Sequence, residues 1–458
     1  MTELPEWVKK YKSKGIEIRK FGNRYYAYSV SSKYDKNKKR ARKITGEYLG
    51  VVTESGIFKK SAIPIVHTDY EYGAVALLYG IAEKTLNPII KKHYPLLFER
   101  IIAFAILRLI DPLPLKSVRY IYEKTYLSDV FDETMSPESL SNLLWALSDQ
   151  KSTEIMRELS EKGEYMLMDM TAIFSRSKSI NIAEPGHNAD EIHLPQINIL
   201  LLFSITKMVP TFIRIVPGSI RDVSTLINTI AMTSSSIVIL IMDKGFYSKD
   251  NIKELEKHHI KYIIPLRRDS LLRPELKEFA GVFKYEGRPI KYWNRSNNVI
   301  AYEDPELKAE EEKDYLDRIN EGKRSRKEYM ASEGSFGKLY LLSNVNDSPE
   351  NIYKLYKQRE YIEYAFNVFK NLLEADKTYL RDANMLSSYM FLNLLSLYLY
   401  FQVLNMSDGK YSVRDILLIL SRIKIYKYKD SEILGEIPKK AKELVQKLSI
   451  NLEVLRKK

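Results

Sequence analysis

The sequence predicts an α/β fold built around a mixed β-sheet. Four apolar runs have the length and composition of buried strands, namely YMLMDMTAIF, QINILLLFSI, VPTFIRIVPG and SIVILIM. A helical pattern separates the third run from the fourth, and a further helix over residues 356–370 comes late in the chain. Strands and helices that alternate in this order favour a sheet with helices packed on its faces.

Length and charge set the scale of the molecule and the kind of partner it has. The 458 residues exceed what one hydrophobic core usually organises, so we expect roughly two to four domains. The 72 Lys and Arg residues outnumber the 59 Asp and Glu residues, which gives a net charge of +13. An excess of this size favours a polyanionic partner, and nucleic acid before a membrane.

The motifs that are missing exclude several classes of protein. Without cysteine the chain can form neither disulfides nor thiolate metal sites. It contains no H-E-x-x-H pair and no G-x-x-x-x-G-K-[ST] loop, so we expect neither a zinc hydrolase nor a protein with a nucleotide cofactor. The absence of H-x-x-R argues against a tyrosine recombinase. The charged first residues, MTELPEWVKK, do not resemble a signal peptide.

Before the four apolar runs, the chain changes pattern once. Residues 1–65 contain short alternating strands and many Lys and Arg residues, so we predict a small β-rich basic region. Within it, KYDKNKKRARK is expected to form a hairpin tip, either as a solvated loop or as a contact with a nucleic-acid backbone. Residues 66–162 show helical periodicity and predict a helical region.

The rest of the chain is predicted to form a core divided by an insertion. The core begins with residues 163–267 and continues with 341–405, which include the late helix. Between these parts, residues 268–340 alternate like β-hairpins and then become charged and helical, so we expect a β-rich insertion. Residues 406–458 are predicted to be helical. The uncharged stretch 383–407 contains Asn, Gln and Ser side chains that lipid would leave unsatisfied, so we expect a buried helix and no membrane span.

Two aspartates interrupt or close apolar strands. Asp169 lies inside YMLMDMTAIF, and Asp243 lies where SIVILIM ends and a glycine turn begins. A buried ionised carboxylate costs several kcal/mol unless it is paired, protonated or bound to a metal. The ends of strands are also where open α/β sheets bind ligands. Two simpler roles stay open: Asp243 could cap the helix that begins near Lys249, and Asp169 could pair with an arginine.

The late helix carries a third acid beside cations. The helix expected over YKQREYIEYAFNVFK places Tyr356, Arg359, Glu363 and Lys370 on one face, next to its buried side. The simpler interpretation is an exposed ion pair between Arg359 and Glu363, worth a few tenths of a kcal/mol. If the face instead meets nucleic acid, Arg359 and Lys370 are suited to clamp phosphates. Tyr356 would then contact the backbone or a base.

Three converging carboxylates indicate a metal site. Without a metal, Asp169, Asp243 and Glu363 would repel one another and raise their pKa values. Mg²⁺ prefers oxygen ligands and would hold them together. Two such ions, about 3.5 to 4 Å apart, activate an attacking oxygen and stabilise a leaving oxygen in phosphoryl transfer. The three acids are therefore the candidate catalytic and metal-binding residues.

The sequence resembles the DDE insertion-sequence transposases of the branch marked by Y-x-x-R-x-x-x-E-x-x-x-x-x-x-K. Its D-x-T motif resembles Asp169-Met170-Thr171, and its D-x-G-[FY] motif resembles DKGF at 243–246. One position departs, because Ser219 replaces an Asn that follows a Gly in the family. The resemblance extends from about Gly15 to Tyr400. All four positions of the branch signature are matched, by Tyr356, Arg359, Glu363 and Lys370.

The resemblance implies an RNase H-like catalytic core that is interrupted by the β-rich insertion. The 120 residues from Asp243 to Glu363 leave room for such an insertion. In such enzymes Asp169, Asp243 and Glu363 would hold two Mg²⁺ ions, for which Mn²⁺ can substitute. Water and then the freed 3′-hydroxyl would attack DNA phosphodiesters.

The resemblance also implies partners and a cellular place. The partner would be double-stranded DNA, both the inverted-repeat ends of a transposon and the target, bound by a homodimer. Residues 66–162 are the candidate region for binding the ends, and 406–458 the candidate region for dimerisation. The resemblance further implies that the DNA passes through a hairpin at the transposon end. Trp293 in the insertion would then stack on a base turned out of the duplex when this DNA hairpin forms, or else pack the small core of a β-hairpin. A prokaryotic cytoplasm, in association with the nucleoid, is the expected location.

Two other functions stay open. An RNase H-like nuclease would cut DNA without joining it to a target. A domesticated DNA-binding protein would do neither, but the three acids and the full signature argue against a loss of activity.

Overall fold

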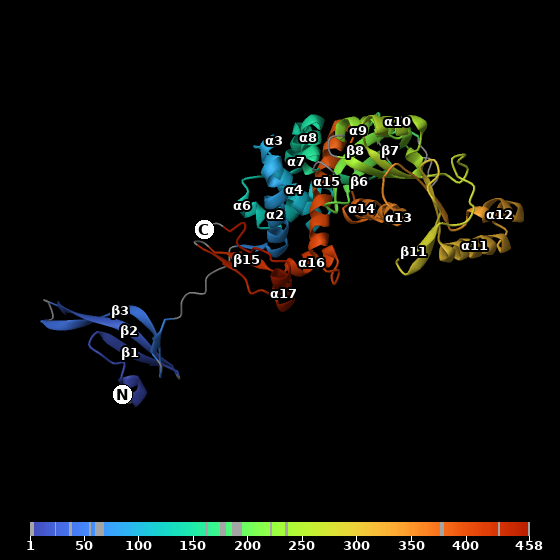
Figure 1. The fold of residues 1–458 in the computed structure, drawn as a ribbon. Coiled ribbons are helices and arrows are strands. Elements are labelled where there is room, and N and C mark those ends of the chain that lie inside the picture. Colours follow the sequence, from blue (N-terminus) through green and yellow to red (C-terminus); the bar gives the residue numbers. More distant parts are fainter. Residues whose placement is uncertain are drawn as a thin grey trace. The chain divides into compact units, whose positions relative to one another are not determined.

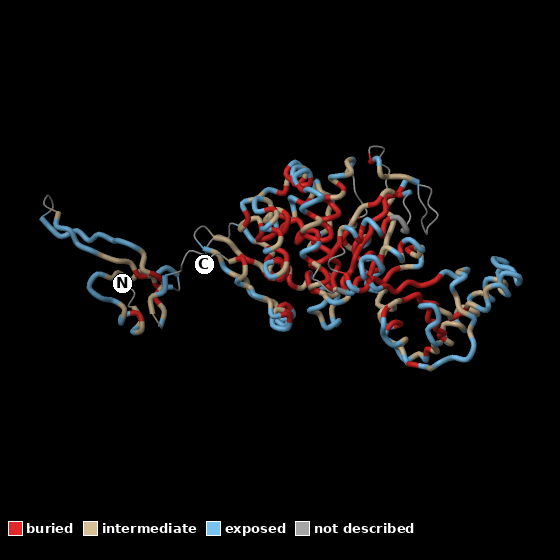
Figure 2. Tube along the Cα trace, turned by 45° about the horizontal axis from the view of Figure 1, so that its top comes forward, coloured by how far each residue is buried: buried red, intermediate tan, exposed pale blue. Residues whose placement is uncertain are grey.

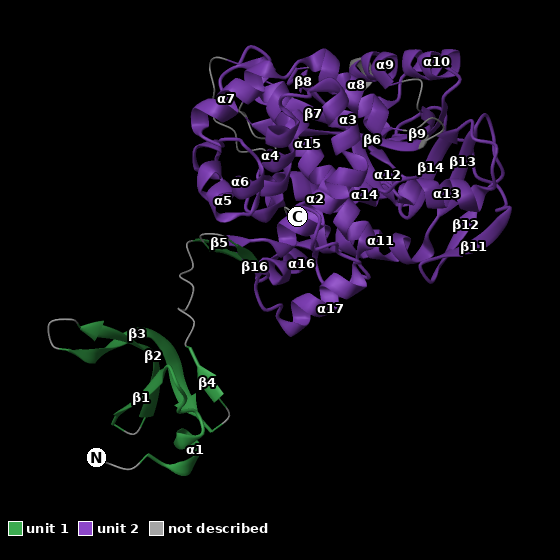
Figure 3. Cartoon of the chain, turned by 90° about the vertical axis from the view of Figure 1, so that its left-hand side faces the viewer, with its two compact units in different colours: residues 1–68, 426–433 green, residues 69–425, 434–458 purple. Residues whose placement is uncertain are grey.

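The structure is a computed structural model, and the chain forms two compact units, each described by itself (Figure 3). The smaller unit contains Met1–Thr68 and Tyr426–Ile433, and the larger contains Asp69–Ile425 and Leu434–Lys458. The residues described are 4–22, 24–35, 39–54, 56–59, 68–160, 164–174, 180–185, 195–219, 222–233, 237–375, 380–428 and 431–456.

The smaller unit contains an antiparallel four-stranded sheet in the order β1-β2-β3-β4. Val8, Tyr25, Ala27 and Val52 form its small core. Beyond this core, β2 and β3 continue as a paired ribbon with exposed side chains. The β-rich region expected at the start of the chain is present, although residues 36–38 of the hairpin tip lie outside the described residues. The elements are α1 (Glu6–Lys9), β1 (Ile16–Phe21), β2 (Arg24–Asp35), β3 (Arg40–Thr53) and β4 (Gly56–Phe58).

Within the described residues, the larger unit is built on a mixed sheet of nine strands, in the order β11-β12-β13-β14-β10-β9-β6-β7-β8. Figure 1 labels its strands β6, β7, β8 and β11. Within this sheet β6, β7 and β8 pair antiparallel, whereas β9 runs parallel to β6 and β10 parallel to β9. The strand β7 is buried along its whole length, which explains its unbroken apolar run. The predicted α/β core with a mixed sheet is therefore confirmed. Its elements are β6 (Glu164–Phe174), β7 (Gln196–Ser204), β8 (Val209–Pro217), α9 (Asp222–Thr233), β9 (Ile237–Met242), α10 (Lys249–Lys257) and β10 (Lys261–Pro265).

The insertion extends this sheet. The strand β14 pairs antiparallel with β10, with Leu342 opposite Ile264, and β13, β12 and β11 follow in turn. The charged stretch after β13 forms α11, whose first N–H groups are capped by Asp304. The insertion is thus continuous with the rest of the sheet. Its elements are β11 (Gly281–Tyr285), β12 (Arg288–Tyr292), β13 (Val299–Glu303), α11 (Pro305–Asn320), α12 (Arg326–Ser332) and β14 (Lys338–Ser343).

The long helix α15 (Ala383–Met406) joins the sheet to a group of helices, since it packs on β8, α4 and α7. Its side chains are buried without a break over residues 388–401, and buried positions concentrate around it (Figure 2). The buried helix predicted for the uncharged stretch is confirmed, and no helix in the described parts of the chain has the length and apolarity of a membrane span. The helices of this group are α2 (Gly73–Thr85), α3 (Asn87–His93), α4 (Phe98–Ile110), α5 (Val118–Lys124), α6 (Leu127–Val130), α7 (Pro137–Ala146) and α8 (Asp149–Leu159).

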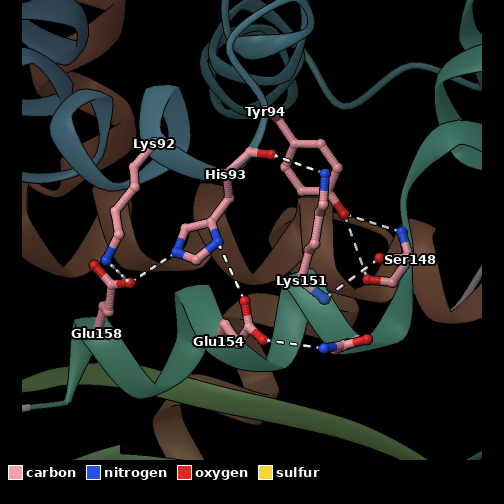
Figure 4. A network of polar contacts seen from close by, with 8 residues as sticks. Lys92, His93, Tyr94, Ser148, Lys151, Glu154 and Glu158 are labelled. Atoms are coloured by element: carbon pink, nitrogen blue, oxygen red, sulfur yellow. Dashed lines mark hydrogen bonds and ion pairs between the residues drawn. The ribbon is translucent and has the colours of Figure 1, made fainter.

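Polar contacts fix α3 against α8 (Figure 4). The ring of His93 lies between two acids of α8, with Nε2 2.7 Å from Glu158 and Nδ1 3.4 Å from Glu154. Lys92 also contacts Glu158, at 2.7 Å. Next to them the hydroxyl of Tyr94 accepts the backbone N–H of Ser148, the residue that caps α8. These contacts account for His93 as a structural residue.

The last part of the chain was predicted to be helical and contains short strands as well. A three-stranded sheet has the order β16-β15-β5. Strands of three or four residues are too short to show an alternating pattern, which is why the sequence did not indicate them. The elements are β5 (Thr68–Glu71), α16 (Val413–Leu420), β15 (Lys424–Lys427), β16 (Glu432–Leu434) and α17 (Lys439–Lys447).

Candidate active site

The two aspartates lie side by side on neighbouring parallel strands. In the parallel pairing of β6 with β9, Met168 lies opposite Met242. Asp169 and Asp243 are the next residues of the two segments, so they lie beside each other where β9 ends. The side chain of Asp169 is 19% exposed and that of Asp243 is 32% exposed. The helix α10 is capped by Ser248, whose hydroxyl accepts the N–H of Asn251. Asp243 therefore does not serve as that cap.

Asp169 has the more perturbed environment of the two. Burial raises the pKa of its carboxyl to about 6, against the lowering effect of Arg359 and of the N–H of Met170. That N–H donates to Oδ1 of Asp169 at 2.8 Å. The surroundings of this carboxyl therefore disfavour its ionised form unless a cation lies close to it.

A single guanidinium supplies that cation. Arg359 donates from Nη1 to Oδ1 of Asp243 at 2.9 Å and from Nη2 to Oδ2 of Asp169 at 3.1 Å. Its side chain is 12% exposed. Burial alone would lower the pKa of Arg359, but the charges of Asp169 and Asp243 raise it. The predicted pairing of Asp169 with an arginine is thus present, and the same arginine also holds Asp243.

Glu363 completes the cluster from a third element. It lies on α14 (Glu360–Asn367), and its Oε1 is 3.8 Å from Nη2 of Arg359. Its side chain is 61% exposed, far more than either aspartate. The ion pair between Arg359 and Glu363 that the sequence suggested therefore exists, but it is longer than the ion pairs of Arg359 with Asp169 and Asp243.

The single late helix predicted from the sequence is wrong, because the structure divides it. One helix, α13 (Pro349–Lys357), ends before Arg359, and α14 begins after it. Between them the backbone tightens, since the N–H groups of Arg359 and Ile362 bond to carbonyls three residues back. After α14 the chain widens into a π-helical turn over Val368–Leu372. These changes of winding place Arg359 in the junction, where it reaches both strands.

Lys370 and Tyr356 flank the cluster. Lys370 lies in the π-helical turn and donates from Nζ to the carbonyl of Ala172 on β6 at 2.8 Å. Tyr356 lies on α13 with its ring centroid 5.9 Å from the guanidinium carbon of Arg359, and burial raises its pKa. Both side chains contact the site, while their binding to DNA stays a prediction.

Trp293 is distant in sequence and built into the insertion. Its Nε1 donates to the carbonyl of Lys277 at 2.9 Å, and the half-buried ring packs on the main core. The neighbouring cations, expected to face phosphates, have partners within the chain: Lys291 contacts Glu303, and Arg295 donates to the carbonyl of Val345. These contacts favour the packing role, and base stacking by Trp293 stays a prediction.

One buried residue at the back of the site was missed. Arg108 of α4 donates to the carbonyl of Leu113 at 2.8 Å and to that of Leu373, directly after the π-helical turn. Its Nε also bonds to Oδ1 of Asn393 on α15. Arg108 thus ties the helical group to the end of the segment that carries Arg359. Arg108 is the one charged residue in the otherwise apolar run IIAFAILRLI, and this was the signal that could have found it.

The donor set fits hard divalent cations, because the three acids offer only oxygen atoms and already surround one positive charge. Within the described residues, no group of three or more acidic or histidine side chains is closed tightly enough to hold a metal. The acids are spread around the guanidinium instead.

Comparison with known proteins identifies the type of domain that contains these residues. Residues 168–399, which include all three acids, match the family model described as "Transposase DDE domain". No curated protein sequence matches the chain. Among solved structures, a piggyBac transposase synaptic complex with hairpin DNA is 10% identical over 76% of this chain and 79% of that chain, with a TM-score of 0.40.

Proposed function

We propose that this chain, which belongs to the family of DDE transposase domains, is an active DNA transposase of the branch with the Y-x-x-R-x-x-x-E-x-x-x-x-x-x-K signature. It binds the inverted-repeat ends of a transposon, cleaves the DNA and joins it to a target. The proposal rests on one observation: Asp169, Asp243 and Glu363 approach the same guanidinium from β6, β9 and α14.

The three acids are proposed to hold two Mg²⁺ ions, for which Mn²⁺ can substitute. When bound, such ions activate the attacking oxygen and stabilise the leaving oxygen of a phosphodiester. Asp169 and Asp243 form the fixed side of this site, because neighbouring parallel strands set their positions. Glu363, on a helix and largely exposed, forms the adjustable side.

Arg359 has two tasks in this proposal. In the metal-free protein it offsets the charge of two partly buried carboxylates, to which it donates at 2.9 and 3.1 Å. If bound cations offset the charge of Asp169 and Asp243, the planar guanidinium of Arg359 would be available to a phosphate, which it can bind through two parallel N–H donors. Lys370 and Tyr356 flank it and would complete the contact with the DNA backbone.

The wider assignments follow from the family resemblance and the charge of the chain. The net charge of +13 supports a DNA partner. We assign end binding to residues 66–162 and dimerisation on DNA to residues 406–458, in a prokaryotic cytoplasm at the nucleoid. A nuclease that does not join strands would use the same three acids, so only a joining assay separates it from a transposase.

The test compares cleavage with DNA binding, using DNA that carries the sequences flanking the gene. Asp169→Asn, Asp243→Asn and Glu363→Gln should each abolish Mg²⁺-dependent cleavage and leave binding in a gel-shift assay largely intact. The matched control is Glu360→Gln, an exposed acid of the same helix, which should cleave normally. Full cleavage by any of the three site variants would remove that residue from the site.

A further inference from the structure

The positive charge of the chain is concentrated in its first 68 residues. They contain 16 Lys and Arg residues against 6 Asp and Glu residues, and so contribute ten of the thirteen net charges. The remaining 390 residues, which include the whole catalytic sheet, are nearly neutral. Long-range attraction to a polyanion is strongest where positive charge is concentrated. The smaller unit is therefore the part of the chain that a polyanion attracts most strongly.

Within this unit the cations gather on the ribbon formed by β2 and β3, outside the small core. Residues 31–34 of β2 and 40–47 of β3 are exposed. The register places Lys33 directly opposite Arg42 on one face, and Ser32 opposite Lys43 on the other. Arg40 lies opposite Asp35 at the far end. Both faces of the ribbon therefore carry cations, and neither has a core to pack on.

This arrangement costs stability in the free protein. Like charges directly opposite each other on a strand pair repel, and a two-stranded ribbon without a packed face is marginally stable by itself. Lys43 is partly neutralised by Glu17, 2.9 Å away. Among the described residues, however, no carboxylate forms an ion pair with Lys33 or Arg42. A polyanionic partner would convert this repulsion into binding.

The shape of the ribbon selects double-stranded DNA among polyanions. The major groove of B-DNA is about 12 Å wide and admits a two-stranded β-ribbon, whereas that of A-form RNA is too narrow. Five residue pairs at about 3.4 Å each give an arm of about 17 Å, the length of roughly five base pairs. Tyr34, 62% exposed near the tip, adds a phenol that can reach a sugar or phosphate.

We propose that the β2–β3 ribbon is a DNA-binding arm that enters the major groove, with Lys33, Arg40 and Arg42 on the phosphates at its edges. The arm assigns a DNA contact to the smaller unit, separate from the catalytic cluster. It rests on the proposed function for the identity of its partner, since a transposase must hold duplex DNA. It needs no metal, so binding through the arm persists in a chelator.

The test uses the full chain and a fluorescently labelled DNA duplex, with anisotropy measured over a series of salt concentrations in EDTA. The variant Lys33→Ala/Arg40→Ala/Arg42→Ala should bind about tenfold or more weakly, and the slope of log affinity against log salt should fall by about two to three. The matched control, Lys313→Ala/Lys323→Ala/Lys327→Ala, removes the same charge from exposed positions on or beside α11 and α12. It should leave both the affinity and the slope unchanged.

A second variant guards against a misfolded arm. Arg40→Lys/Arg42→Lys keeps the charges, and because Lys also binds phosphate it should retain the affinity and slope of the wild type. An unchanged slope in the triple alanine variant would overturn the proposal, and so would binding of duplex RNA as tight as that of DNA. The catalytic proposal fails separately: a chain that never cleaves but loses DNA affinity in the triple variant refutes the catalytic function and keeps the arm.

Discussion

Replacing Asp169 by asparagine should stabilise the metal-free protein while it removes activity. Burial raises the pKa of this carboxyl to about 6, and Arg359 offsets only part of that effect. An aspartate in an unfolded chain has a pKa of about 3.9. Folding therefore favours the protonated form, and at neutral pH the ionised carboxyl opposes folding by roughly 3 kcal/mol.

The pH dependence gives this prediction its sign. Below about pH 4 Asp169 is protonated in both the folded and the unfolded state, so its burial does not reduce the free energy of unfolding. As the pH rises from about 4 to 6 the unfolded state loses its proton first, and the folded state becomes progressively less favoured. Asp169→Asn keeps the shape and the bond from Met170 without the charge. The free energy of unfolding of Asp169→Asn should thus exceed that of the wild type by an amount that grows from near zero at pH 4 to about 1–3 kcal/mol at pH 7. This range allows for the ion-pair partner that Arg359 loses.

The assay is calorimetric unfolding of both proteins in EDTA between pH 4 and pH 8. Glu363→Gln is the matched control, because it makes the same change of acid to amide at a side chain that is 61% exposed. Its unfolding free energy should change by less than about 1 kcal/mol. The explanation from burial would be refuted if Asp169→Asn were no more stable than the wild type at pH 7. It would also be refuted if the gain in stability at pH 4 were as large as the gain at pH 7.

Three further predictions concern other residues of the larger unit. Arg359→Ala or Lys370→Ala should weaken binding of transposon-end DNA and flatten its salt dependence by about one unit of slope, whereas an unchanged slope in both would leave them as structural ion partners. Trp293→Ala should leave the first nick near normal and slow hairpin formation or its resolution by about tenfold, with rescue by an abasic site if stacking is worth roughly 1 to 3 kcal/mol. A failed rescue with a lowered melting temperature would assign Trp293 to packing. Arg108→Met should reduce the unfolding free energy in urea by about 2–4 kcal/mol, because buried carbonyls lose their donor, and a loss below about 1 kcal/mol would contradict its role as a tie.

The strands that carry the two aspartates could be predicted because the signal that marks them is local. An aspartate inside an apolar strand is costly enough to mark a site by itself, and Asp169 and Asp243 do lie together on β6 and β9. The core was predictable for the same reason, since long apolar runs leave few alternatives to a buried sheet. The sequence also indicated that Arg359 and Glu363 belong to one cluster.

Features that depend on distant contacts could not be predicted. Helical periodicity over 356–370 gives no sign of the tight junction at Arg359, because that break is stabilised by bonds to strands more than a hundred residues earlier. The helical periodicity also gives no sign that Arg359 binds the carboxylates of Asp169 and Asp243, whereas the sequence favoured a contact with a phosphate. The insertion joins the rest of the sheet through the pairing of β13 with β14 and of β14 with β10, and no hairpin pattern in the sequence contains the non-local second pairing.

The central claim is that the three acids serve DNA joining as well as cutting. The most direct measurement is strand transfer: a labelled duplex with the end sequence flanking the gene is incubated with the chain, Mg²⁺ and a supercoiled target plasmid. The proposed function predicts labelled joint molecules with the wild type, none in EDTA and none with Glu363→Gln, although that variant still binds the duplex. Cleaved ends without joint molecules would make the protein a nuclease, and joint molecules formed equally well by Glu363→Gln would contradict the assignment of the site.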